Sequence, residues 1–173
     1  MERQNLWEVY TDEQVKELEG VCENYKKYLD KGKTERECIS EAVKLAKEVG
    51  YKDLKDVIAT GEKLVKGDKV YAVCMDKTIA LFHIGEEPLE NGMHILGAHV
   101  DSPRIDLKQN PLYEAGQLSY FDTHYYGGVK KYQWVTIPLA IHGVVAKKDG
   151  TVVDICIGEK EADPVVFISD LLI

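Results

Sequence analysis

The chain has 173 residues, of which 45% are hydrophobic and 30% are charged, and these values indicate a folded globular protein. Its 30 acidic residues outnumber its 22 basic residues, which gives a formal net charge of −8. This charge disfavours binding to nucleic-acid phosphates, and no basic amphipathic stretch suggests binding to a membrane surface.

Two helices are predicted within the first 50 residues. The first begins after Thr11 and ends at Gly32, and the second begins after Thr34 and ends at Gly50. Each starting threonine is followed three residues later by Gln or Glu, the pattern of a capping box. Their apolar faces consist of Val15, Leu18, Cys22, Tyr25 and Leu29 in the first helix, and of Cys38, Ala42, Leu45, Ala46 and Val49 in the second. The short turn between them predicts a helical hairpin, which we expect to pack against a β-sheet.

From residue 68 onward the apolar pattern changes to that of β-strands. Residues 70–75 and 78–84 flank a short turn and predict a hairpin. Residues 93–100 are apolar on both faces, which predicts a central strand of a sheet.

The second half of the chain is predicted to contain fewer strands. Residues 101–128 include two prolines and several glycines, so we expect them to be irregular. Residues 134–146 and 151–157 predict a second hairpin, and a new element starts near Val165. Because residues 169–173 are apolar and resemble the inside of an element, we expect the chain to be a piece of a longer protein.

The four cysteines, Cys22, Cys38, Cys74 and Cys156, are widely spaced and form no Cys-x-x-Cys pair. This spacing predicts buried free thiols and argues against disulfides or a zinc knuckle. A reducing, cytoplasmic location is therefore expected.

His99 and Asp101 are the first candidate functional residues. Strand alternation places them on one face at the end of the predicted central strand, where sites form in open α/β sheets. A neutral imidazole is a good ligand for a divalent metal, and a nearby carboxylate can orient it through the other ring N–H. The residues alone leave two interpretations open: a metal-binding histidine oriented by an aspartate, or a His–Asp hydrogen bond that only caps a strand.

Residues 94–104, with the sequence His-Ile-Leu-Gly-Ala-His-Val-Asp-Ser-Pro-Arg, resemble the first metal motif of the M18 metalloaminopeptidases, the family of aspartyl aminopeptidase and vacuolar aminopeptidase I. Residues 126–128 with Trp134 resemble the next landmark of that family, and residues 163–171 resemble its passage toward an inserted dimerisation domain. The resemblance implies an α/β fold in which an N-terminal helical hairpin packs on a mixed β-sheet. Residues 1–130 would form the N-terminal part of a zinc-exopeptidase-like catalytic domain, and residues 131–173 a β-hairpin segment leading into the inserted domain.

The resemblance also implies a function. It implies an aminopeptidase that removes N-terminal residues from peptides at a dinuclear site holding two zinc ions per full-length subunit, with cobalt or manganese as alternative metals. His99 would be a metal ligand and Asp101 the catalytic-site acid that orients it. The metals would polarise the scissile carbonyl and generate a hydroxide nucleophile. The family's other ligands and general base follow later than Ile173, so we expect this chain alone to be inactive.

Candidate partners follow from the same resemblance. The full-length protein is expected to bind peptides and to form a homo-oligomer, with no nucleic acid or membrane as partner. His124, Tyr126 and Arg104 are candidate substrate-binding residues, although His124 and Tyr126 could equally belong to a packed turn. Arg104 could bind a substrate carboxylate or pair with Asp106, and we favour the pair.

The sequence departs from the family pattern at one place, and two alternative functions stay open. Aspartyl-type members carry a Trp-Phe-Asp-Arg-Asp pattern after the Gly-Gly landmark, whereas residues 130–135 read Lys-Lys-Tyr-Gln-Trp-Val, so the sequence leaves both acidic and neutral N-terminal residues open as the preferred substrate. The competing function is that of a non-catalytic short relative that binds peptides or caps an oligomer. A third option is an unrelated metallohydrolase that uses His99 and Asp101 with other partners.

Overall fold

The computed structural model describes residues 4–169, which divide into two compact units. The first unit ends at Val100 and the second begins at Asp101. The predicted boundary between residues 130 and 131 concerns the domains of the family and stays a prediction. In chain order the elements are η1 (Leu6–Glu8), α1 (Asp12–Lys31), α2 (Glu35–Glu48), β1 (Lys52–Asp53), α3 (Leu54–Thr60), β2 (Lys69–Cys74), β3 (Thr78–His83), η2 (Leu89–Asn91), β4 (Arg104–Ala115), β5 (Leu118–Tyr126), η3 (Lys131–Gln133), β6 (Ile141–Ala146) and β7 (Val152–Ile157).

The predicted helical hairpin is confirmed by α1 and α2, and local capping explains where each helix begins. The Thr11 hydroxyl accepts a hydrogen bond from the backbone N–H of Gln14, whose side chain accepts one from the N–H of Thr11. Thr34 and Glu37 form the same reciprocal pair before α2. Each pair satisfies N–H groups that have no partner within the helix.

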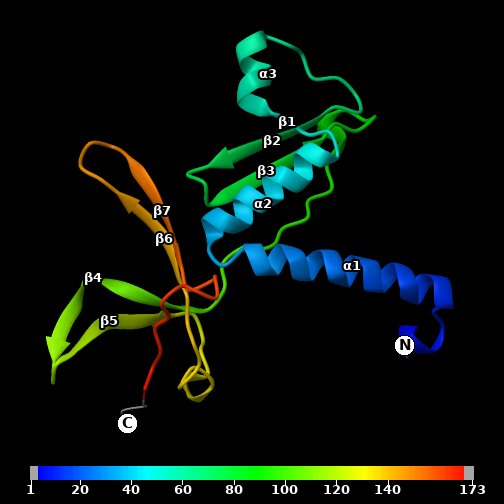
Figure 1. Ribbon diagram of the computed structural model, residues 1–173. Coiled ribbons are helices and arrows are strands. Elements are labelled where there is room, and N and C mark those ends of the chain that lie inside the picture. The colour runs from blue at the N-terminus through cyan, green and yellow to red at the C-terminus, as the bar shows by residue number, and fades with distance from the viewer. Residues whose placement is uncertain (1–3, 170–173) are drawn as a thin grey trace. The chain divides into compact units, whose positions relative to one another are not determined.

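The first unit combines helices with a mixed sheet of order β1-β2-β3, so the predicted α/β class is confirmed. β1 is parallel to β2, and β2 is antiparallel to β3. α2 lies against β2 and β3, and α3 contacts β1 and β2 (Figure 1). α1 contacts α2 but buries none of its own residues, so α2 is the half of the hairpin that builds the core with the sheet.

The core of the protein is small. Among residues 4–169 the buried hydrophobic side chains all belong to the first unit, and they are Cys38, Ile39, Ala46, Val57, Val70 and Tyr71. They come from α2, α3 and β2, so packing of these three elements supplies the apolar stabilisation of the unit.

The elements β1 and α3 have no counterpart in the sequence prediction. The Asp53 carboxylate caps α3 by accepting a hydrogen bond from the backbone N–H of Lys55 at 2.9 Å. Gly61 ends the helix in the left-handed region, with φ at +70°. The signal for this helix was an Asp cap and a Gly stop around one buried valine, Val57.

The predicted central strand at residues 93–100 is wrong. Residues 92–103 have no regular secondary structure, and the side chains of Ile95 and Leu96 are 79% and 100% exposed. A central strand needs a hydrogen-bonded neighbour on each side, and β1, β2 and β3 form their sheet without this segment. The apolar composition of residues 93–100 is typical of a strand, but no strand among residues 4–169 pairs with this segment.

The expectation of an irregular segment at residues 101–128 is also wrong, because β4 and β5 form an antiparallel hairpin there (Figure 1). Pro103 precedes β4, and Pro111 lies where the register shifts between Leu107 and Leu112, so neither proline has to donate a ladder hydrogen bond. Gly116 and Gln117, with φ of +58° and +65°, form the two-residue turn. These prolines and glycines thus shape a hairpin rather than interrupt one.

The second predicted hairpin is confirmed as β6 and β7, although its first strand begins at Ile141 rather than at residue 134. The new element near Val165 appears as isolated bridges, Val135 with Ile168 and Leu139 with Val166. Of the apolar ending at residues 169–173, residues 170–173 lie outside the described residues.

The cysteines are free, as predicted, but only Cys38 is buried, and Cys22, Cys74 and Cys156 are exposed. The prediction of buried thiols was therefore wrong for three of the four: Cys22 lies on α1, which buries none of its residues, Cys74 is the exposed last residue of β2, and Cys156 is exposed on β7. No helix in the described part of the chain is long and apolar enough to cross a membrane.

Candidate functional site

Asp101 is the first residue of the second unit and is partly buried. The hydroxyl of Tyr126, the last residue of β5, donates a hydrogen bond to its Oδ2 at 3.0 Å. Hydrogen bonds to a carboxylate are stronger than those between neutral groups. The orientation of Asp101 is therefore tied to the end of the β4–β5 hairpin.

Arg104 pairs with Asp106, as the sequence analysis favoured. Its Nε lies 2.7 Å from Asp106 Oδ1, and both side chains are largely covered. The guanidinium also lies over the ring of Tyr126, 4.1 Å from the ring centroid. Arg104 and Tyr126 are partners in the β4–β5 register, so the strand pairing itself brings the two side chains together.

Gly127 brings the end of β5 close to the loop that precedes β4. Its φ is +73°, a conformation that favours glycine, and a β-carbon at this position would lie 3.4 Å from Pro103 Cα. The chain around Asp101 thus meets the Tyr126–Gly127 corner through both a hydrogen bond and a backbone approach.

His99 lies in the stretch without regular secondary structure before Asp101, and its side chain is exposed. The strand geometry predicted for His99 and Asp101 is wrong, since neither residue belongs to a strand. His124 lies in β5 opposite Asp106, is exposed, and has its Nδ1 3.3 Å from the carbonyl of Tyr125.

The second unit therefore brings together Asp101, Tyr126 and Arg104 from the predicted set, with Asp106 as the fourth member of the cluster. The sequence analysis did not predict the contact between Tyr126 and Asp101, because it treated Tyr126 only as a candidate for substrate binding. This contact could have been predicted only from the register of the β4–β5 hairpin, which depends on recognising the turn at Gly116.

The residue types present suit a divalent metal, but the described residues do not complete a site for one. Within residues 4–169, no group of three or more His, Cys, Asp or Glu side chains is arranged to hold a metal ion. A catalytic zinc ion uses about three protein ligands. His99 and Asp101 can thus supply one imidazole and one orienting carboxylate, and the other ligands would have to come from elsewhere.

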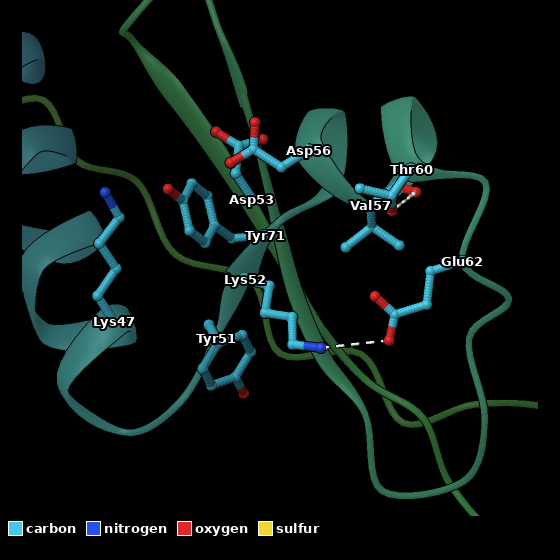
Figure 2. Close-up of a pocket in the computed structure, with 9 residues that line it drawn as sticks. All are labelled: Lys47, Tyr51, Lys52, Asp53, Asp56, Val57, Thr60, Glu62 and Tyr71. Atoms are coloured by element: carbon cyan, nitrogen blue, oxygen red, sulfur yellow. Dashed lines mark hydrogen bonds and ion pairs between the residues drawn. The ribbon is translucent and has the colours of Figure 1, made fainter.

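A shallow pocket of about 360 Å³ lies in the first unit, beside α3 and β2 (Figure 2). Its lining carries both signs of charge, and Lys52 and Glu62 pair across it at 3.3 Å. Asp53 is engaged as the cap of α3. Since its lining contains no histidine or cysteine, the pocket does not offer the imidazole ligand that residues 94–104 suggest.

The chain is similar to known proteins over nearly its whole length. The family model described as aminopeptidase I zinc metalloprotease (M18) matches residues 28–173. The chain is 54% identical over 172 residues to the probable M18 family aminopeptidase 1 of Clostridium acetobutylicum, and the match covers 99% of this chain and 37% of that relative.

Solved structures give a consistent result. The crystal structure of aminopeptidase I from Clostridium acetobutylicum matches with a TM-score of 0.83 and 54% identity, covering 100% of this chain and 38% of that one. The crystal structure of aminopeptidase I from Borrelia burgdorferi B31 matches with a TM-score of 0.88 and 41% identity, covering 97% of this chain and 41% of that one. The chain thus spans well under half the length of the relatives it matches.

Proposed function

The chain belongs to the M18 peptidase family, and on this premise we propose that it is the part of a zinc aminopeptidase that carries the first metal-binding motif. The observation that carries the proposal is the family match over residues 28–173, which includes the motif at residues 94–104. The full-length enzyme would hydrolyse N-terminal residues from peptides.

The roles proposed for this chain fall on two residues. His99, exposed in a stretch without regular secondary structure, would bind one of two zinc ions, with cobalt or manganese as alternative metals. Asp101, held by the Tyr126 hydroxyl, would orient the His99 imidazole and fix its tautomer. The chemistry that zinc supplies in such a site is polarisation of the scissile carbonyl and activation of water. Residues outside the described part would provide the other ligands and the general base.

Three residues of the second unit are candidates for contact with the substrate. His124 is exposed on β5, whereas Arg104 and Tyr126 are engaged with Asp106 and Asp101. These contacts favour His124 over Arg104 and Tyr126 for direct contact with the substrate. A homo-oligomeric full-length protein in the cytoplasm, without nucleic acid or membrane as partner, remains part of this proposal.

The test is hydrolysis of aminoacyl chromogenic substrates by the full-length protein encoded by the complete reading frame, in wild type and in His99→Ala. We expect wild-type activity that a zinc chelator abolishes and that His99→Ala lacks. The 173-residue chain assayed alone should be inactive. Hydrolysis by this chain that depended on His99 would contradict the proposed need for further ligands.

The incomplete ligand set among the described residues favours one alternative, a non-catalytic short relative that binds peptides or caps an oligomer. The reading frame distinguishes the two functions. A stop codon directly after Ile173 would favour the alternative, and a frame that continues into further Asp, Glu and His motifs would favour the enzyme.

A further inference from the structure

We propose that Tyr126 is a positioning residue for the metal site: its hydroxyl holds the Asp101 carboxylate, and Arg104 in turn holds the Tyr126 ring. This inference rests on the proposed function, because Asp101 is taken to orient the metal-binding His99. It differs from the substrate-contact role considered for Tyr126 from the sequence alone.

The hydrogen bond from Tyr126 restrains the Asp101 carboxylate. The hydroxyl donates to one carboxylate oxygen, Oδ2, at 3.0 Å. An ionised carboxylate accepts hydrogen bonds at both oxygens, so a bond to Oδ2 is compatible with a second donor such as an imidazole N–H. The phenol thereby restricts rotation of the carboxylate, which otherwise extends from a segment without regular structure.

Arg104 supports the Tyr126 ring, which lies at the open end of the hairpin. Tyr126 is 38% exposed, so packing alone does not fix its ring. The Arg104 guanidinium covers one ring face at 4.1 Å from the centroid, and its Nε is bound to Asp106 at 2.7 Å. A cation over an aromatic face is attracted by the ring quadrupole. The salt bridge to Asp106 thus fixes the Arg104 guanidinium, and the guanidinium restrains the Tyr126 ring.

The backbone brings the hairpin end close to the loop that carries Asp101. Register pairs Arg104 with Tyr126 at the open end of the β4–β5 hairpin, and Gly127, with its φ of +73°, directs the chain against Pro103. Asp101 lies two residues before this proline. The hairpin end therefore determines the separation between the Tyr126 hydroxyl and the Asp101 carboxylate.

The test uses the full-length protein loaded with zinc and compares Tyr126→Phe with the matched control Tyr125→Phe. Both changes remove only a hydroxyl, and Tyr125 is the adjacent residue on β5, 58% exposed, with Lys131 over its ring. Two quantities are measured: the rate of zinc release to a chelator in the absence of substrate, and kcat and KM for a chromogenic substrate.

Removing a group that orients a metal ligand costs about 10- to 100-fold in metal affinity or activity, so removing the support of such a group should cost about 3- to 10-fold. We expect Tyr126→Phe to accelerate zinc release and lower kcat by that factor with KM unchanged, and Tyr125→Phe to leave both values at the wild-type level. Arg104→Gln should shift both quantities in the same direction as Tyr126→Phe, because the ring then loses its support.

Three results would overturn the inference in distinguishable ways. Equal zinc release and kcat in wild type and Tyr126→Phe would refute the positioning role and leave the proposed function standing. A raised KM with unchanged kcat and zinc release would assign Tyr126 to substrate binding instead. A wild-type protein that neither binds zinc nor cleaves peptides would overturn the proposed function together with this inference.

Discussion

Replacing Ile39 by alanine should destabilise the first unit strongly, because the core of that unit is small. Ile39 lies on α2 and is 2% exposed. The substitution removes three buried carbon groups worth about 0.8 kcal/mol each, so the lost burial alone costs about 2.4 kcal/mol. The cavity left behind adds to this, and buried Ile→Ala changes cost about 2–5 kcal/mol in total.

The expected loss is a large part of the total, since a unit of this size is stable by about 5–15 kcal/mol. A loss of about 3 kcal/mol should lower Tm by about 12–24 °C in a domain of up to about 100 residues. The assay is thermal and denaturant unfolding followed by the helical circular dichroism signal. The α-helices of residues 4–169 all lie in the first unit, so this signal reports that unit.

The matched control is Leu45→Ala on the same helix, where the side chain is 51% exposed. Since half of this side chain stays in water and alanine favours the helix, its cost should stay below about 1 kcal/mol. Equal losses in Ile39→Ala and Leu45→Ala would refute the assignment of the core to the face of α2 that carries Ile39.

Three other predictions concern separate parts of the chain. Burial, with Cys38 as a neighbour, raises the pKa of Tyr28 from 10.0 to about 12. The neutral phenol therefore stabilises the fold fully below pH 10, and this contribution is lost as the pH rises to about 12. In unfolding experiments at different pH values, Tyr28→Phe should abolish this loss of stability at alkaline pH. Tyr25→Phe, a change at an exposed residue, should retain it. Gly158→Ala should destabilise the β6–β7 hairpin, because the φ of Gly158 is +104° and a β-carbon there would lie 2.9 Å from Ala140 Cα. Gly143→Ala should leave the hairpin stable, because the space around Gly143 is open. Amide exchange of β7 distinguishes them, and equal protection in both variants would count against the clash. Zinc titration of the 173-residue chain by calorimetry should show weak or no binding, and tight binding lost in His99→Ala would mean that the described residues hold a complete site after all.

The helix starts could be predicted because their signals are local. A capping box involves a threonine and a residue three positions later, and both members lie within one turn of the chain. The same holds for the hairpin of β2 and β3, whose turn residues and strand pattern are adjacent in sequence. These elements could be predicted because residues that are neighbours in the sequence determine their geometry.

The errors arose where geometry depends on distant residues. Pro111 looks like a strand breaker, but it is tolerated at the register shift opposite β5. Residues 93–100 have strand composition, but a strand forms only when another strand pairs with it. For the candidate site, the motif identified His99 and Asp101, whereas the Tyr126 hydroxyl 25 residues away could be found only from the hairpin register.

The stretch without regular secondary structure at residues 92–103 also determines how the molecule can be divided. Proteases cleave best in accessible segments without regular structure, so limited digestion should cut first between the last residues of β3 and the first of β4. The fragments would contain the helices with their sheet on one side and the two hairpins on the other. Such a cut would place the His99 imidazole at or near a new chain end, and would show whether the Asp101–Tyr126 contact persists when the preceding unit is removed.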